Sequence, residues 1–456
     1  MYIPWMAPRT RTIDRTSGLA NDNVYVISLR ELTIKEVVST VGCKDATAQV
    51  SKVMLALLIA FWTWNAYSKM FTWAITVDPE VYMDSTQLIT SKGYPCENHY
   101  ITTEDGFILN MQRIPHGRAP KCDKFRLHIR PKPVVILQHG LEASSSNWLD
   151  NLANESLAYL LADAGADVWL GNVRGNMYSR NHTKLSPDQE EFWAWSWDEM
   201  AAYDLPAMLD YVTRTTGQKQ VHYVGHSQGT LIGFAGFTSN KTLAAMVKQF
   251  YALAPVAKVH HIESPIRLLA PFAKDIAAFY ELLGRGEFLQ YNRKLMDFLA
   301  KYVCTRLGEY LCENVLFVLG GTDSSHLNIT RVPVYVAHNP GGTSVQNILH
   351  FAQGVNIDAF QKFDFGSAAE NTMHYNQSTP PTYQLEDLTV PTVTYTGGRD
   401  SLADPDDCAW LLSHLPASIL RAHLSFPEWE HLDFIWAYDA SKLCYSDIIK
   451  RIFTAP

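Results

Sequence analysis

The sequence predicts an α/β fold built on a mostly parallel sheet, and two of its features carry this prediction. Short apolar runs recur along the chain and each leads into a turn that contains glycine or proline, at residues 133–138, 167–170, 221–224, 250–253 and 391–395. Helix-like stretches lie between these runs, at residues 197–214 and 228–237. Strands that are apolar on both faces are typical of a parallel sheet covered by helices, and their alternation with helices indicates the α/β class.

The length and composition are those of an ordinary globular chain. Its 456 residues are 47% hydrophobic and 18% charged, which suffices for one large core with an insertion or for two domains. The formal net charge of -8 argues against a nucleic-acid partner, because that partner requires a concentrated basic face. The chain has no H-E-x-x-H motif and no C-x-x-C pair, so we expect neither a metal nor a cofactor.

An apolar segment lies near the N-terminus, at residues 53–75. Its first 12 residues follow Lys52 and precede a small-x-small pattern, as in the hydrophobic region of a cleaved signal peptide. The alternatives are an uncleaved membrane anchor and a segment that is neither a signal nor an anchor. An anchor would need the whole stretch of residues 53–75, and polar residues interrupt its later half. We expect a leader at residues 1–77 and a catalytic domain at 78–456. Signal regions rarely lie so far into a chain, so a further hypothesis is that Met54 is the true initiator.

The alternation of strands and helices breaks between about residues 258 and 383. This stretch is richer in helix-like and irregular segments, and strand character returns only near Val390. The simplest interpretation is a largely helical insertion that covers the ends of the sheet. A second independent domain is the weaker alternative, because the sheet pattern continues after the insertion.

The strongest local motif is Gly225-His-Ser-Gln-Gly229, which matches G-x-S-x-G between an apolar strand and a helix. A sharp strand-to-helix turn lifts the serine hydroxyl clear of the sheet, and small neighbouring residues permit the strained backbone. This context identifies Ser227 as a candidate nucleophile and predicts the α/β-hydrolase fold. The alternative is a structural serine in a motif that arises by chance.

A serine hydroxyl needs a base and an orienting carboxylate, and in this fold they follow in the order acid, then histidine. Asp400 directly follows the strand-like run at 391–395 and is the candidate acid. Asp404 competes with it, although a helix N-cap is the plainer role for Asp404. His431 follows a later strand-like run and is the candidate base, while His414 and His423 lie in the same region.

An acyl-transfer enzyme also needs two backbone amides that stabilise the oxyanion. The amide of Gln228 lies at a helix N-terminus directly after the nucleophile, and the amide of Leu141 follows an early strand. Gly140 permits the unusual backbone there. We expect His139 to brace this loop by hydrogen bonding rather than to act as a base.

Glycosylation sequons indicate passage through the secretory pathway. Five N-x-S/T sequons begin at Asn154, Asn181, Asn240, Asn328 and Asn376. The seven cysteines are too few and too scattered for a disulfide-built scaffold. Cys304 and Cys312 are close enough in sequence to close one short loop.

Longer motifs, spread in order over most of the chain from about residue 78 onward, resemble one known family. They are Gly93-Tyr-Pro-Cys-Glu97, Thr103-Glu-Asp-Gly-Phe-Ile-Leu109, His139-Gly-Leu-Glu-Ala-Ser-Ser-Ser-Asn-Trp148, Gly171-Asn-Val-Arg-Gly-Asn-Met-Tyr-Ser-Arg-Asn-His182, Phe192-Trp-Ala-Trp-Ser-Trp-Asp-Glu-Met200, Gly225-His-Ser-Gln-Gly-Thr230, His338-Asn-Pro-Gly-Gly-Thr-Ser-Val-Gln-Asn347, Gly398-Arg-Asp-Ser-Leu-Ala-Asp404 and His431-Leu-Asp-Phe434. In these motifs the chain resembles the acid lipases, which include gastric lipase, lysosomal acid lipase and insect lipases. We expect an insect or other invertebrate member.

The resemblance implies the same triad and the same two oxyanion amides. It also implies that the insertion is a cap with a mobile lid within about residues 290–321, over an apolar acyl pocket. Cys304 and Cys312 lie where the family has a disulfide at the lid. Gly320 stands where some members have a free cysteine, so their thiol sensitivity is not expected here. The long leader also departs from the family, which usually begins with a short signal.

The expected function is therefore hydrolysis of the ester bonds of neutral lipids, triacylglycerol or cholesteryl esters, through an acyl-enzyme on Ser227 and without a cofactor. The expected partner is the lipid substrate at a lipid–water interface, with transient contact to a membrane or lipid droplet. The chain is expected to be secreted or lysosomal. A carboxylesterase or acyltransferase with the same triad, a peptidase of this fold and a catalytically silent lipid-binding relative are the alternatives. The intact triad argues against the silent relative.

Overall fold

The computed structural model of this chain describes residues 77–118, 132–289 and 326–454. The predicted leader at 1–77, the predicted lid at 290–321, and Cys304 with Cys312 fall almost wholly outside these ranges. Across the described ranges, no helix is long and apolar enough to cross a membrane.

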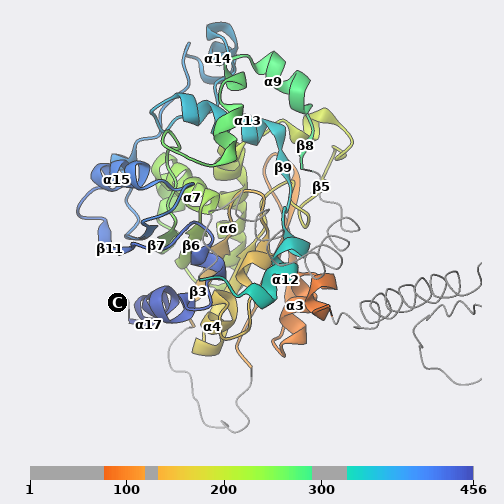
Figure 1. Cartoon of the computed structure of the whole chain (residues 1–456), viewed down its shortest axis with the longest axis vertical. Coiled ribbons are helices and arrows are strands. Elements are labelled where there is room, and N and C mark those ends of the chain that lie inside the picture. The colour runs from red at the N-terminus through yellow and green to blue at the C-terminus, as the bar shows by residue number, and fades with distance from the viewer. Residues whose placement is uncertain (1–76, 119–131, 290–325, 455–456) are drawn as a thin grey trace, which may run out of the picture. The chain divides into compact units, whose positions relative to one another are not determined.

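A nine-stranded sheet forms the centre of the described fold, and six of its strands are parallel (Figure 1). In spatial order, the parallel strands are β4 (Asp167–Gly171), β3 (Val134–Gln138), β6 (Val221–His226), β7 (Val247–Leu253), β10 (Thr392–Gly397) and β11 (Leu420–Phe426). The five apolar runs of the sequence correspond to β4, β3, β6, β7 and β10. All residues of β3, β4, β6 and β10 are buried, as expected for strands that are covered on both faces.

The register of the parallel strands brings the candidate residues to one edge of the sheet. Gln138, at the end of β3, lies beside Gly225 of β6, and His226 of β6 lies beside Leu253 of β7. The loops that leave the carboxyl ends of these strands therefore meet. In open α/β sheets this edge is the place where ligands bind.

Three antiparallel strands extend the sheet beyond β4. They are β1 (Glu97–Thr102), β2 (Phe107–Ile114) and the short β5 (Asn181–His182), and β2 pairs with β4. Four of the six residues of β1 are exposed, as befits an edge strand. The sequence did not predict these strands, so the sheet is mixed at one end.

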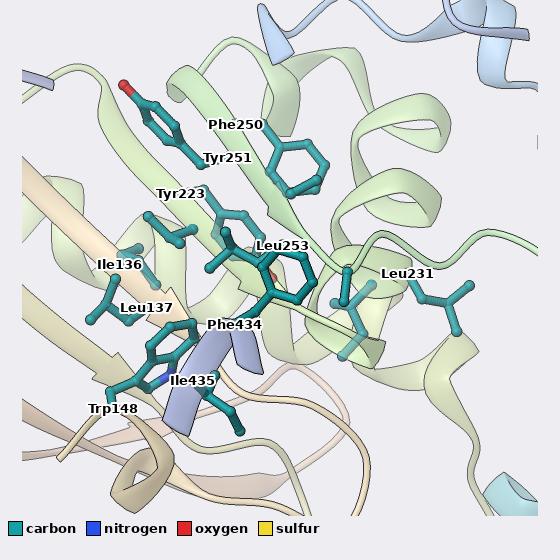
Figure 2. Close-up of a cluster of buried hydrophobic side chains, with 14 of the residues drawn as sticks. Ile136, Leu137, Trp148, Tyr223, Leu231, Phe250, Tyr251, Leu253, Phe434 and Ile435 are labelled. Atoms are coloured by element: carbon teal, nitrogen blue, oxygen red, sulfur yellow. The ribbon is translucent and has the colours of Figure 1, made fainter. Parts of the chain in front are cut away.

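Helices cover the sheet and enclose the core. Helix α6 (Leu205–Thr216) packs on α7 (Gln228–Ser239), and α4 (Leu157–Ala164) packs on the turn that leads into α17 (Ser446–Thr454). Eleven of the twelve residues of α7 are buried, so this helix lies in the interior. Figure 2 shows part of the core, where side chains of β3, β6 and β7 meet Phe434 and Ile435 of α16 (Asp433–Trp436).

The segment between β7 and β10 contains four α-helices among its described residues. These are α9 (Ile276–Leu283), α12 (Val332–His338), α13 (Val345–Asn356) and α14 (Ala368–Tyr375). Helices α9, α13 and α14 lie together at one end of the described fold (Figure 1), where a small apolar cluster of their own joins α9 to α13. A two-stranded sheet of β8 (Glu287–Phe288) and β9 (Thr343–Ser344) lies beside them. The side chain of Leu141 packs against both this cluster and the main core.

Candidate active site

Ser227 occupies a strained turn between β6 and α7. Its backbone has φ 55° and ψ −122°, a conformation that a residue with a side chain rarely adopts. The amide of Ser227 donates to the carbonyl of Leu253 at 3.1 Å, and its own carbonyl accepts from the amide of Thr230 at 2.8 Å. The backbone bonds to β7 and within α7 hold the strain in place, as the G-x-S-x-G motif predicts.

The glycines of the motif are explained by close backbone approach. A Cβ at Gly225 would lie 2.8 Å from the backbone of Gly229, and a Cβ at Gly229 would lie 2.5 Å from the carbonyl oxygen of Gln138. A Cβ at Gly140, on the loop after β3, would lie 2.9 Å from the Cβ of Ser227. The loop with the first candidate oxyanion amide therefore lies against the candidate nucleophile.

His431 and Asp400 are paired in the interior. The Nδ1 of His431 donates to the Asp400 carboxylate, at 2.9 Å from Oδ2 and 3.0 Å from Oδ1. The amides of Leu402 and Ala403 also donate to Asp400 Oδ1, at 2.9 and 2.7 Å. Burial acts to raise the pKa of Asp400, but the charge of His431 and these hydrogen bonds outweigh it, so the pKa lies below its ordinary value.

Two glycines bring the loops of Asp400 and His431 together. A Cβ at Gly397 or Gly398 would lie 2.4 Å from a backbone oxygen, that of Trp429 or Pro427 respectively. On the far side of His431, the side chains of α16 are buried in the core, and Phe434 is 0% exposed. The histidine loop is therefore held between the end of β10 and a buried helical turn.

The competing residues have other roles. Asp404 caps α15 (Pro405–His414), since its side chain accepts from the amide of Asp406 at 2.8 Å. His414 lies at the end of the same helix, with Nδ1 2.8 Å from the carbonyl of Trp410. His423 lies on β11 and contacts Thr394. The structure thus pairs His431 with Asp400 and gives each competitor a different partner.

The loop after β3 is braced by His139, as the sequence predicts. Its Nε2 accepts from the amide of Val173 at 3.3 Å and from Asn176 Nδ2 at 3.1 Å, so the proton lies on Nδ1, which donates to the carbonyl of Gly140 at 2.8 Å. Burial lowers the pKa of His139 to about 4, so the ring is neutral near neutral pH and is only a weak base.

The two candidate oxyanion amides lie on segments that meet at Ser227. The amide of Leu141 follows the braced loop, and that of Gln228 opens α7. No hydrogen bond joins either amide to another residue within the described ranges. Two free amides beside a serine side chain are what an oxyanion site requires.

Two residues of this site were not predicted from the sequence. His226 donates from Nε2 to the carbonyl of His431 at 3.0 Å, and Asn347 of α13 donates from Nδ2 to Gln228 Oε1 at 2.7 Å. Both belong to motifs that the sequence contains, the G-x-S-x-G motif and the motif that ends at residue 347. Their hydrogen-bond partners lie far away in the chain, so no local signal points to them.

The predicted sequons differ in accessibility. The side chains of Asn154, Asn181, Asn240 and Asn376 are exposed. Asn328 is half-buried, and its Nδ2 donates to Glu155 at 3.1 Å. Glycosylation attaches at this nitrogen, so the first four sites are better placed to carry a glycan.

Two family models match the chain, and they cover most of it together. The model described as a partial alpha/beta-hydrolase lipase region matches residues 85–152, and that of the alpha/beta hydrolase fold matches residues 133–438. The second match agrees with the fold that the sheet and its helices form.

Curated relatives match over nearly their whole length. The lysosomal acid lipase/cholesteryl ester hydrolase of Homo sapiens is 48% identical over 87% of this chain and 97% of its own. The gastric triacylglycerol lipase of Rattus norvegicus is 49% identical over 82% of this chain and 93% of its own. Lipase member M of Homo sapiens is 44% identical over 87% of this chain and 92% of its own. The chain thus belongs to the acid lipase family of the α/β-hydrolase fold, as its motifs predicted.

Proposed function

We propose that this chain is a lipase that hydrolyses the carboxylic ester bonds of neutral lipids through an acyl-enzyme on Ser227. The observation that carries the proposal is the buried His431–Asp400 pair, at 2.9 Å, whose histidine loop is bound at 3.0 Å by His226, the residue before the strained Ser227. Membership of the acid lipase family supports it, because the names of the relatives specify triacylglycerol and cholesteryl esters.

The proposed roles in the reaction are those of a serine–histidine–aspartate triad. His431 takes the proton from Ser227 as the serine oxygen attacks the ester carbonyl, and Asp400 holds the Nδ1–H tautomer that leaves Nε2 free as the base. The amides of Leu141 and Gln228 stabilise the negative oxygen. The alcohol leaves with the proton from His431, and water then releases the fatty acid with the roles reversed. No cofactor takes part in these steps.

We also propose that the segment of residues 258–383 is the cap and that it touches the lipid surface. Six large apolar side chains among the described residues of this segment are exposed: Leu268 (74%), Phe272 (47%), Leu282 (56%), Leu289 (49%), Ile329 (37%) and Met373 (69%). A group of exposed apolar side chains on one segment is typical of an interaction surface for apolar partners. The proposed lid at 290–321, with a disulfide between Cys304 and Cys312, would adjoin this surface, since Leu289 directly precedes it.

The surface contact can be separated from the chemistry. Replacing Leu268 and Phe272 with serine should lower hydrolysis of emulsified triolein several-fold while hydrolysis of a water-soluble butyrate ester stays unchanged. Leu443→Ser is the matched control, because Leu443 is also 49% exposed but lies outside the cap segment, in the turn before α17. Equal loss on both esters would mean that these residues serve folding or the site itself rather than the surface.

We infer that the chain enters the secretory pathway. Five sequons support this, four of them with exposed asparagines, and relatives are named as lysosomal and gastric lipases. The full chain expressed in a secretory host should lose apparent mass on treatment with an endoglycosidase. A mass that does not change would contradict this route.

The proposed activity is tested with the secreted full chain and its Ser227→Ala variant. Fatty acid release would be followed from emulsified triolein, emulsified cholesteryl oleate and a soluble butyrate ester, from about pH 4 to about pH 8. Release from an emulsion that disappears in Ser227→Ala identifies a lipase. Cleavage of the soluble ester alone would instead identify a carboxylesterase, and folded protein without serine-dependent release would be a silent lipid-binding relative.

A further inference from the structure

Asn347 is buried at the start of α13, in the segment between β7 and β10. It is 0% exposed, and its backbone amide donates to the Oγ of the N-cap residue Ser344 at 2.9 Å. This capping bond fixes the first turn of α13, so the side chain of Asn347 leaves the helix in a defined direction.

The carboxamide of Asn347 joins three separate elements. Its Oδ1 accepts from the amide of Trp197 at 2.8 Å, and its Nδ2 donates to Thr343 Oγ1 at 3.0 Å and to Gln228 Oε1 at 2.7 Å. The Trp197 amide can only donate, so it determines which atom of the carboxamide is oxygen. Both hydrogens of Nδ2 are then used, and one of them belongs to the bond with Gln228.

Within the described ranges, the other end of the Gln228 side chain has no comparable partner. Its Nε2 lies 3.5 Å from the sulfur of Met200, a weak acceptor, at the start of a π-helical turn (Met200–Asp204). The bond from Asn347 is therefore the strong contact that holds this buried side chain. Gln228 is 1% exposed, so water cannot replace that bond.

The backbone of Gln228 is the part of the residue that takes part in the proposed chemistry. Its amide directly follows the strained Ser227 and makes no bond to another residue in the described ranges. The carbonyl of Ser227, in the same peptide, accepts from the amide of Thr230 at 2.8 Å and from Thr230 Oγ1 at 2.6 Å. The anchored side chain of Gln228 is a second restraint on this peptide, because it limits how far the residue can rotate. An oxyanion donor loses most of its effect when it no longer points at the oxygen.

We propose that Asn347 is a positioning residue for the oxyanion hole, and that it holds the amide of Gln228 in place by binding its side chain from α13. The inference rests on the proposed function, in which that amide stabilises the oxyanion. It also assigns to the segment between β7 and β10 a direct mechanical link to the catalytic turn, in addition to covering the site.

The test is a double-mutant cycle on the secreted full chain, with a soluble butyrate ester as substrate. Asn347→Leu removes the donor, Gln228→Met removes the acceptor at nearly constant shape, and the double variant removes both. Each single change should lower kcat about tenfold, with KM changed less than about twofold, because the bond acts on the transition state rather than on substrate binding. The double variant should be no slower than the slower single variant.

A matched control separates positioning from stability. Asn371 of α14 is 3% exposed, and its side chain accepts from the amide of Phe365 at 3.0 Å and donates to Asp364 at 2.9 Å, all within the same segment. Asn371→Leu thus makes the same change in a buried asparagine that has no link to α7. It should lower the melting temperature as Asn347→Leu does and leave kcat near that of the wild type.

A second measurement reports on the oxyanion site itself. A phosphonate ester inactivates such a serine through a negatively charged intermediate, so its second-order rate should fall in Asn347→Leu in parallel with kcat. The proposal would be overturned if the losses in kcat of the two single variants multiplied in the double variant. It would also be overturned if Asn371→Leu lost as much kcat as Asn347→Leu. A failure of the proposed function would appear earlier and differently, as a wild-type chain without serine-dependent activity.

Discussion

The side chain of His226 donates a hydrogen bond of 3.0 Å from Nε2 to the backbone carbonyl of His431. The two rings lie 4.8 Å apart, and His226 directly precedes Ser227 at the end of β6. The strand that carries the candidate nucleophile therefore also holds the loop that carries the candidate base. Burial, as the largest cause, and the charge of His431, as the next, lower the pKa of His226 to about 3. The ring therefore stays neutral, and its hydrogen-bond partner is a backbone carbonyl rather than a carboxylate.

Removing this link should displace His431 relative to Ser227. We expect His226→Phe to lower kcat on the butyrate ester about tenfold with little change in KM, because a small shift of a catalytic base affects the transition state most. His226→Gln keeps an N–H donor and should recover part of the rate. His423→Phe is the control, since His423 lies on β11 and contacts Thr394. Wild-type kcat in His226→Phe would show that the loop is positioned without this bond.

Gly140 tests the position of the oxyanion loop by steric means. A Cβ at this residue would lie 2.9 Å from the Cβ of Ser227 and 3.3 Å from His226 Nδ1, so Gly140→Ala must push the loop away from the nucleophile. Loss of one oxyanion donor costs about a hundredfold in kcat, and we expect a fall of that order. Gly286→Ala, where no atom of the described residues lies within 4 Å of the added Cβ, should remain active. Normal activity in Gly140→Ala would place the reacting carbonyl elsewhere.

The parallel part of the sheet could be predicted from sequence because burial on both faces leaves a continuous apolar run. The antiparallel part could not, because β2 buries polar side chains. Asn110 and Gln112 are 4% and 1% exposed and hydrogen-bond to each other, and Asn172 Nδ2 donates to Gln112 Oε1 at 3.0 Å. Residues 109–112 alternate apolar and polar side chains, yet all four are buried, so β2 lacks the continuous apolar run from which the parallel strands were predicted.

The candidate triad could be predicted because each member follows a strand, and strand ends are visible in local sequence. Its supporting bonds could not. His226 and His431 are 205 residues apart, and Gln228 and Asn347 are 119 apart. Such pairs are set by how the helices and loops pack, and a local pattern of hydrophobicity carries no information on them. Asp404 illustrates the reverse case. Its position in the sequence makes it a second candidate for the acid beside Asp400, but in the structure it caps α15.

Arg174 is a buried cation whose removal should destabilise the fold. It is 1% exposed and binds Asp204 through Nε and Nη2, at 2.9 and 2.7 Å, and Asp105 through Nη1 at 2.6 Å. Arg174→Met leaves Asp204, which is 0% exposed, as a buried charge with no cation beside it, and we expect a loss of about 3–5 kcal/mol in the free energy of unfolding by urea.

The control for this prediction is the exposed pair of Arg214 and Asp210 on α6. Its atoms lie 2.7 Å apart, with side chains 71% and 50% exposed, and such pairs contribute at most about 0.5 kcal/mol. Arg214→Met should therefore unfold at nearly the wild-type urea concentration. Equal midpoints for the two variants would mean that the Arg174 network contributes no more than a surface pair.

Glu142 follows the candidate oxyanion residue Leu141, and it makes stability depend on pH. Its Oε2 accepts from the amide of Gly342 at 3.1 Å, while its buried Oε1 has no hydrogen-bond partner among the residues that the structure describes. Burial raises the pKa of Glu142 well above its ordinary value; the Gly342 amide opposes this shift, and the nearby charge of Glu287 adds to it. The folded chain therefore holds this proton more tightly than the unfolded chain does.

The sign of the effect follows from which state releases the proton first. As pH rises above about 4.5, the unfolded chain ionises this carboxyl while the folded chain does not, so stability falls as pH rises, by up to about 1.4 kcal/mol per pH unit. Glu142→Gln removes that slope and should gain stability over the wild type as pH is raised from about 5 to about 7.5. Urea unfolding of both chains at the two pH values measures the difference, and other titrating groups cancel because both chains contain them. The exposed Glu104→Gln variant should follow the wild type. If the wild type and Glu142→Gln lose stability in parallel, the Glu142 carboxyl is ionised in the folded chain at both pH values.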